Sequence, residues 1–198
     1  MQDFLESTNF TSIFIGLVVL KFLLETYLNL RNLKSIELNK NAIPERFVGV
    51  VTEEEYKKSI FYNIDRIKFQ IFTALFGAVV LIIFTLGGLF NFLAEIVVST
   101  TSSDVLGAVL LGLLLLVVEQ VISLPISIYS TFVIEEKHGF NKTTTKTFVT
   151  DIIKSLLISA TISSVIYATV IYIVVNLGDN WWIYAFGAVF TLQAVIFF

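Results

Sequence analysis

The sequence predicts an all-α polytopic membrane protein with about five transmembrane helices and its N-terminus outside. Three observations support this prediction: the composition, the long apolar runs and the placement of the basic residues. Of the 198 residues, 56% are hydrophobic and 15% are charged, and the mean hydropathy is +0.86. Soluble domains carry about 25% charged and about 45–50% apolar residues, so this composition is typical of a membrane protein.

Five apolar runs define the expected spans, at about 10–28, 69–92, 105–134, 155–177 and 181–198. The first four reach the roughly 20 residues that a helix needs to cross about 30 Å of hydrocarbon. Transmembrane strands would instead show alternating segments of about ten residues. The third run is too long for a simple span and contains Pro125. There we expect a kink rather than a break, because neighbouring helices can compensate for the lost backbone hydrogen bond.

The basic residues predict the orientation of these spans. Eight of the 13 Lys and Arg residues lie between the first and second runs, four lie between the third and fourth, and Lys21 lies inside the first run. The positive-inside rule therefore places both basic loops in the cytosol and the N-terminus outside. The expected location is the endoplasmic reticulum membrane in a eukaryote or the plasma membrane in a prokaryote. The lipid bilayer is an expected partner, and no nucleic acid is.

The last apolar run ends at Phe198 without a polar flank or a basic anchor. Its 18 residues from Trp181 would give a helix of about 27 Å, which is barely a span. We expect the chain to be cut from a longer protein, and the alternative is a naturally short final helix.

Residue counts exclude several kinds of chemistry. The chain has no cysteine and a single histidine, His138. Thiolate catalysis, disulfides and Cys-ligated zinc are thereby excluded, as is any site that requires two histidines. No catalytic or metal-binding residue is therefore predicted within these 198 residues.

Three charged residues lie inside the expected spans, namely Lys21, Glu25 and Glu119. Charges at membrane depth usually face a bundle interior or water, so these residues are candidates for lining a water-filled chamber. Lys21 and Glu25 lie four residues apart on one helical face. Their alternative role is to pair with each other while Lys21 extends its ammonium toward the interface.

The cytosolic loop at 135–142 gathers carboxylates, an imidazole and a glycine. Its candidate functional residues are Glu135, Glu136, Lys137, His138 and Asn141. A zinc site fails on spacing, because one histidine beside adjacent glutamates does not place two ligands on one helical face. His138 could act as a general base, or the loop could be a turn in which Gly139 permits an otherwise strained backbone.

Several stretches resemble the type 1 CAAX prenyl protease family. They begin with 25–29, 43–47, 55–59 and 62–66, which resemble that family's first helix and first cytosolic loop. Leu124-Pro125 and the run 132–142, with its Glu-Lys-His-Gly-Phe-Asn stretch, are similar to the most recognisable N-terminal segment of the family, and Asp151 and Lys154 also agree. The resemblance covers essentially the whole chain.

The resemblance implies a seven-span zinc endopeptidase whose helices enclose a water-filled chamber. Such enzymes cleave C-terminal tripeptides from prenylated CAAX proteins or act on other membrane proteins. Their zinc site uses His-Glu-x-x-His and a distal Glu, and this chain contains no such motif. Zinc is therefore expected only in the full-length family member. Residues 1–198 are expected to form a single transmembrane region that lacks the catalytic metallopeptidase domain.

This resemblance leads to a function hypothesis with an alternative. The chain forms part of the chamber wall and a scaffold for its own C-terminal metallopeptidase domain, and the loop at 135–142 contacts that domain or the chamber. The alternative is a stand-alone, non-catalytic scaffold or an inactive relative that binds membrane partners. A small transporter fits poorly, because the sequence shows no repeat and no pair of broken helices.

Overall fold

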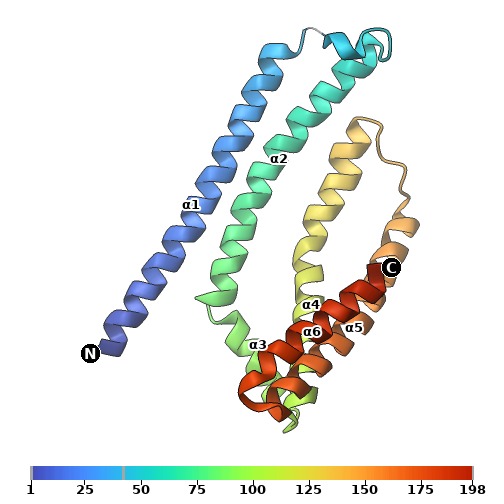
Figure 1. Ribbon diagram of the computed structural model, residues 1–198. Helices are drawn as coiled ribbons and strands as arrows, with labels where there is room; N and C mark the ends of the chain where they lie inside the picture. The colour runs from blue at the N-terminus through green and yellow to red at the C-terminus, as the bar shows by residue number, and fades with distance from the viewer. Residues whose placement is uncertain (1, 42, 198) are drawn as a thin grey trace. The chain divides into compact units, whose positions relative to one another are not determined.

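The computed structural model describes residues 2–41 and 43–197, which form helices joined by short turns (Figure 1). These residues contain no strand, and a single isolated β-bridge joins Val48 to Val51. The helices are α1 (Gln2–Asn39), α2 (Glu53–Thr85), α3 (Leu89–Val98), α4 (Asp104–Tyr129), α5 (Thr145–Asn176) and α6 (Trp181–Phe197). Between them lie 3₁₀ turns at Glu45–Phe47 (η1) and Gly178–Asn180 (η3) and a π-helix at Ser130–Glu135 (η2).

The chain divides into two compact units, which are described separately. Unit 1 comprises Met1–Gly88 and Ile126–Lys142, and unit 2 comprises Leu89–Pro125 and Thr143–Phe198. The chain passes between them at Gly88, within α4 at Pro125, and after Lys142.

In unit 1, α1 and α2 lie side by side as a helical hairpin (Figure 1). The Tyr56 hydroxyl donates to the carbonyl of Asn39 over 3.2 Å, which joins the end of α1 to the start of α2. A capping box begins α2: the Glu55 amide donates to the Thr52 hydroxyl, and the Thr52 amide donates to the Glu55 carboxylate. Capping satisfies amides that have no partner within the helix, so the start of α2 is fixed by these local residues.

The two halves of α2 differ in composition. The stretch 53–68 carries eight charged residues, whereas 69–85 carries none. A helix of 33 residues is about 50 Å long and exceeds the hydrocarbon thickness of about 30 Å. The charged half therefore lies outside the membrane-spanning segment, which begins at Phe69.

The apolar run predicted at 69–92 is divided in the structure. α2 ends at Thr85, and α3 begins at Leu89. Gly88 has φ +77°, a left-handed conformation that favours glycine. At Gly87, an added Cβ would lie 2.6 Å from the carbonyl oxygen of Ile83. Both glycines thus serve the helix break, whereas hydropathy alone treats them as two more residues of one apolar run.

The third predicted span is continuous with respect to helical structure. α4 passes through Pro125 to Tyr129 and leads directly into η2. This agrees with the expectation that Pro125 does not end the helix. A π-helix has wider turns than an α-helix and is rare, and it occurs frequently at functional sites.

In unit 2, α5 and α6 pack against each other through the turn η3. α4 contacts α5 where the ring of Tyr167 lies against Gly112, so closely that a Cβ at position 112 would overlap the ring. Gly112 is therefore a close-packing position, as is usual where membrane helices approach each other. By contrast, nothing lies within 4 Å of an added Cβ at Gly77.

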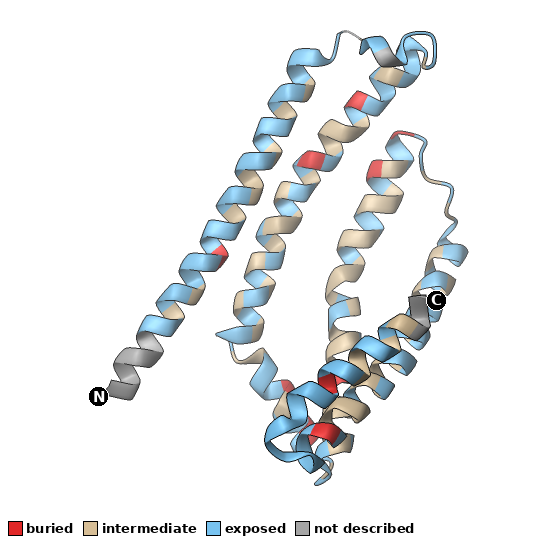
Figure 2. Cartoon of the chain, viewed as in Figure 1, coloured by how far each residue is buried: buried red, intermediate tan, exposed pale blue. Residues whose placement is uncertain are grey.

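Most of the helical surface is exposed (Figure 2). Four helical segments are long and apolar enough to cross a membrane, namely Asn9–Asn39, Glu53–Thr85, Asp104–Glu135 and Thr145–Asn176. In the apolar 18-residue stretch of each segment, only 6% of the residues are buried. Apolar side chains exposed on such a scale are stable when lipid covers them, because a helix satisfies its own backbone hydrogen bonds. α6 adds 17 residues from Trp181. The predicted all-α, membrane-spanning fold class is confirmed.

Candidate functional site

The loop after η2 closes into a tight turn. The amide of Gly139 donates to the carbonyl of Glu136, and the amide of Phe140 donates to the carbonyl of Glu135, both over 2.9 Å. Gly139 has φ +64°, so the turn uses the conformational freedom that the sequence predicted for this glycine. The turn brings the side chains of Lys137, His138 and Phe140 against α2.

Asp65 of α2 binds two side chains of this turn. Its Oδ2 lies 2.7 Å from Lys137 Nζ and 2.8 Å from His138 Nε2. His138 is only 8% exposed, and no other polar residue in the described chain is classed as buried. A buried polar ring requires a hydrogen-bond partner, and Asp65 provides it. Asp65 lies in the charged half of α2, where the bonds from Lys137 and then His138 hold the pKa of its carboxyl below the usual value.

Aromatic contacts complete this arrangement. The ring of Tyr62 meets His138 edge-on at 5.8 Å between centroids and Phe140 at 4.8 Å. Lys58 Nζ lies 5.0 Å from the centre of the Phe140 ring, within cation–π range. Lys58, Tyr62 and Asp65 are spaced four and three residues apart, so they share one face of α2. We call these three residues with Lys137, His138 and Phe140 the α2–loop cluster.

The other loop candidates lie outside the α2–loop cluster. Asn141 Nδ2 donates to the Glu136 carboxylate over 2.9 Å, a bond within the loop itself. Glu136 is exposed, Glu135 is half-buried, and the Lys137 side chain remains 64% exposed. Among the residues that the structure describes, the Glu135 carboxylate forms no ion pair. The loop thus presents one face to α2 and leaves carboxylates on another.

Lys21 and Glu25 pair with each other on α1. Their charged atoms lie 3.1 Å apart, and the side chains are 72% and 42% exposed. This is the arrangement that the sequence offered as the alternative to a chamber-lining role. Both residues belong to unit 1, whereas Glu119 belongs to unit 2.

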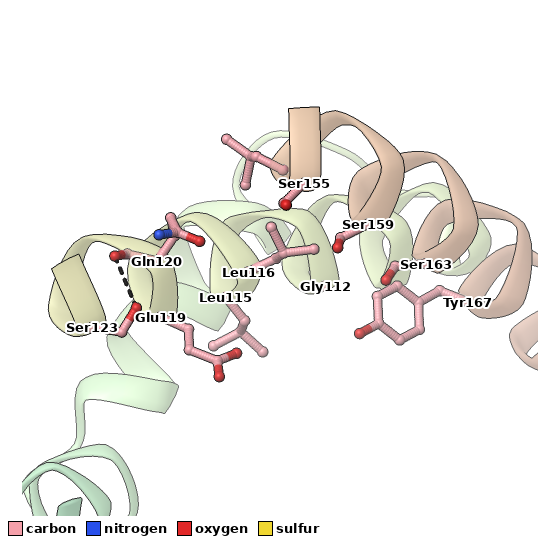
Figure 3. Close-up of a pocket in the computed structure, with 11 residues that line it drawn as sticks. Gly112, Leu115, Leu116, Glu119, Gln120, Ser123, Ser155, Ser159, Ser163 and Tyr167 are labelled. Carbon is pink, nitrogen blue, oxygen red and sulfur yellow. Dashed lines mark hydrogen bonds between the residues drawn. The ribbon is translucent and has the colours of Figure 1, made fainter. Parts of the chain in front are cut away.

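Glu119 lines a cavity of about 420 Å³ between α4 and α5 (Figure 3). α4 contributes Glu119, Gln120 and Ser123, together with Gly112 and two leucines. The Ser123 hydroxyl donates to the Gln120 carbonyl over 3.1 Å. We call this space the α4–α5 cavity.

The opposite wall of the α4–α5 cavity is a row of hydroxyls on α5. Ser155, Ser159 and Ser163 recur every four residues, and Tyr167 continues the row (Figure 3). Within 2–41 and 43–197, the hydroxyls of these three serines have no hydrogen-bond partner. Elsewhere on α5, Thr161 and Ser164 donate to the carbonyls four residues earlier. The row therefore turns its donors toward the cavity, where water or another polar group can satisfy them.

Two features of these sites were not predicted from the sequence. The serine row has a readable signal, since hydroxyls at a spacing of four residues inside an apolar run share one helical face. Asp65 had no comparable signal, because its partners are 72 and 73 residues away. That contact depends on tertiary structure alone.

The described residues offer no site for the zinc that the resemblance implies. Among the described residues, no three His, Asp or Glu side chains come close enough together to hold a metal ion. The single histidine uses its Nε2 to bind Asp65. The residues that the structure describes therefore do not fit a zinc site.

The fold and these sites define a helical polytopic membrane protein. Comparison with known proteins shows the family. The model of the family described as CAAX prenyl protease N-terminal, five membrane helices, matches residues 32–198. The chain belongs to this family.

Curated relatives and a solved structure agree with this assignment. The chain is 32% identical to a CAAX prenyl protease 1 homolog of Oryza sativa subsp. japonica over 90% of its own length and 43% of the relative. It is 32% identical to the homolog of Arabidopsis thaliana, over 92% of itself and 44% of the relative. The crystal structure of S. mikatae Ste24p matches with a TM-score of 0.82 and 27% identity, over 92% of this chain and 43% of that one. The chain thus spans less than half the length of these relatives.

Proposed function

We propose that this chain is the membrane-embedded N-terminal region of a zinc metalloendopeptidase that processes CAAX-type or other membrane protein substrates. In this role it forms part of a chamber wall and a scaffold for a metallopeptidase domain elsewhere in the protein. The observation that supports this most directly is the α4–α5 cavity, since a purely lipid-facing helix pair has no use for unpaired hydroxyls.

The α4–α5 cavity suits a chamber wall that meets water or a peptide backbone. Ser155, Ser159 and Ser163 offer both donors and acceptors, and Glu119 and Gln120 add acceptors on the facing helix. An extended peptide carries one amide donor and one carbonyl acceptor per residue, so a row of hydroxyls can bind it without reading its side chains. Such binding is compatible with both CAAX-type and other membrane protein substrates.

The α2–loop cluster suits a scaffold. Asp65, Tyr62 and Lys58 fix the loop against α2, and this leaves Glu136 and Asn141 on the turn as a preformed surface. A surface that is ordered before contact loses less conformational entropy when a partner domain binds. We propose that Glu135, Glu136 and Asn141 contact the metallopeptidase domain and that Lys137 and His138 hold the loop in place for it.

The proposed orientation keeps the basic loops in the cytosol and the N-terminus outside. The membrane is that of the endoplasmic reticulum in a eukaryote and the plasma membrane in a prokaryote. Cysteines placed at positions 50 and 143, one in each basic loop, test the shared side. An impermeant thiol reagent added to sealed vesicles should label both or neither.

Zinc content and peptidase activity test the proposal as a whole. The 198-residue chain is compared with a form extended to the natural stop codon, using a prenylated CAAX peptide and an unprenylated peptide of the same sequence. We expect only the extended form to bind about one zinc and to cleave. If no longer reading frame exists, or if the extended form is free of metal and inert, the chain is a non-catalytic membrane scaffold.

Loop variants test the scaffold role within the extended form. Glu136→Ala with Asn141→Ala should reduce cleavage while the unfolding temperature stays unchanged. His138→Gln should lower both, because it disrupts the attachment of the loop to α2. Full cleavage by the Glu136/Asn141 double variant would contradict a contact with the metallopeptidase domain.

A further inference from the structure

Besides the α4–α5 cavity of unit 2, a polar groove lies in unit 1, between α2 and the junction of α4 with η2. Its volume is about 400 Å³. The polar residues that line it are Arg66, Gln70, Thr73, Ser127, Ser130 and Thr131. No carboxylate lines this groove, so its charge is positive. We call it the Arg66 groove.

The Arg66 groove lies at the membrane boundary. On α2 it begins at Arg66, two residues before the last basic side chain, Lys68, and extends to Thr73 in the apolar half. On the facing segment it lies at 126–131, near the end of the third apolar run. Lipid phosphates occupy this depth, where a helix changes from charged to apolar residues.

Arg66 is available to an anion. It is exposed, and among the residues that the structure describes it pairs with no carboxylate. Its neighbour Asp65 is already bound by Lys137 and His138. Arginine binds phosphate through two parallel N–H···O bonds, which gives it a geometric preference that lysine lacks.

Unpaired hydroxyls face the same space. Ser130 and Thr131 are the first two residues of η2, and within the described part of the chain neither hydroxyl has a hydrogen-bond partner. Thr73, in contrast, donates to the carbonyl of Gln70 over 3.0 Å. The π-helical turn thus begins where two free donors enter the groove. An apolar wall adjoins them, because the ring of Phe69 lies 4.9 Å from that of Tyr129.

We propose that the Arg66 groove binds the phosphate of an anionic lipid headgroup. Arg66 pairs with the phosphate, Ser130 and Thr131 donate to its oxygens, and the first acyl carbons lie against Phe69. A lipid fits better than a soluble anion, because the groove continues from a cation into an apolar wall. This binding requires no peptidase activity, so it is independent of the function proposed above.

Native mass spectrometry of the full-length protein in neutral detergent tests this site. The probes are phosphatidylglycerol and phosphatidylcholine with the same acyl chains, and the measured quantity is the affinity for one retained lipid. Phosphatidylglycerol should bind more tightly. Arg66→Gln should weaken it about tenfold, the loss expected for one charge-assisted pair. Lys68→Gln is the matched control and should change it less than about threefold, because detergent presents no anionic surface that would attract a lysine outside the groove.

A variant that leaves the charge unchanged distinguishes specific hydrogen bonding of the lipid phosphate from general electrostatic attraction. Ser130→Ala with Thr131→Val should weaken phosphatidylglycerol about fivefold through lost hydrogen bonds, with helicity unchanged by circular dichroism. Equal losses for Arg66→Gln and Lys68→Gln, or no loss for the hydroxyl variant, would overturn the proposal. Displacement of the lipid by inorganic phosphate at similar concentration would show a free-anion site instead. Displacement by a peptide with a free C-terminal carboxylate would show a peptide site instead.

Discussion

The α2–loop cluster and the α4–α5 cavity both hold polar side chains beside apolar helices, but these side chains are paired in the cluster and unpaired in the cavity. In the cluster, Asp65, Lys137 and His138 satisfy one another over 2.7 and 2.8 Å. In the cavity, Ser155, Ser159 and Ser163 are left without partners in the described chain and face open space. Paired polar groups fix a structure, whereas unpaired ones need another molecule. The first region is therefore built for stability and the second for contact with water or another polar molecule.

Asp65→Asn should give the largest effect and would break the cluster. Neutralising the shared partner leaves the Lys137 ammonium and the buried His138 ring without the carboxylate that binds them. Hydrogen bonds to charged groups contribute about 1.5–3 kcal/mol, so we expect the apparent free energy of unfolding in detergent to fall by about 2 kcal/mol. Asp151→Asn, an exposed aspartate at which no ion pair is seen in the described chain, is the matched control and should change it by less than about 0.5 kcal/mol. Equal effects would remove the structural role of the cluster.

Gly112→Ala should have the next largest effect and tests the packing that borders the cavity. An added methyl group overlaps the Tyr167 ring, and overpacking costs about 1–3 kcal/mol. Gly77→Ala is the control, because nothing lies within 4 Å of its added Cβ. For Gly77→Ala we expect the free energy of unfolding to rise by about 0.5–1 kcal/mol from helix propensity alone. Adding Tyr167→Ala should recover part of the loss at Gly112. An unchanged free energy of unfolding for Gly112→Ala would show that α4 and α5 do not pack closely at this point.

Thiol labelling sharpens the claim that the cavity is wet. The chain has no native cysteine, so single cysteines can be read without background. Ser159→Cys should react with a water-soluble thiol reagent about tenfold faster than Leu157→Cys, because the thiolate forms only where water reaches. Leu157 lies on the same helix, and 63% of its surface is exposed on the apolar side. Equal rates would show that the serine row faces lipid and that water does not fill the α4–α5 cavity.

A pH titration tests the cluster by a smaller effect. Partners that lower the folded-state pKa of Asp65 stabilise the fold above its unfolded value of 3.8. This stabilisation is lost as the pH falls from 3.8 through the folded-state pKa, because protonated Asp65 no longer pairs with Lys137. Unfolding temperatures measured from pH 6 downward should therefore drop in this window for the native chain and less steeply for Asp65→Asn. Identical slopes would show that other carboxyls cause the drop.

Lys21→Ala should have the smallest effect and calibrates what an exposed pair contributes. Lys21 and Glu25 lie 3.1 Å apart but are largely exposed. If Lys21 extends its ammonium to the interface, as the sequence allows, the pair meets water there. Pairs exposed to water four residues apart on a helix contribute about 0.3–0.5 kcal/mol, and we expect a loss of this size. The exchange variant Lys21→Glu with Glu25→Lys should retain most of the stability. A loss near 2 kcal/mol for Lys21→Ala would mean that the pair is shielded from water rather than exposed to it at the interface.

The sequence alone determined the fold class and most of the helices. Apolar runs and basic loops predict membrane helices because burial in lipid depends on local composition. Three of the five runs lie, to within one residue, in helices long enough to span, and α2 contains most of the run at 69–92. It also predicted the turn at Gly139 and, through the resemblance, the family. These features depend on residues close together in the chain.

Tertiary structure alone decided the contacts. The break at Gly87 and Gly88 is invisible to hydropathy, because glycine is neutral on that scale while its backbone conformation ends α2. The partnership of Asp65 with Lys137 and His138 joins residues more than 70 positions apart. Whether Ser159 donates to its own helix or to a cavity depends on how far α4 lies from α5. Local sequence specifies each helix, whereas the distance between helices decides which polar groups are satisfied and which are left to bind.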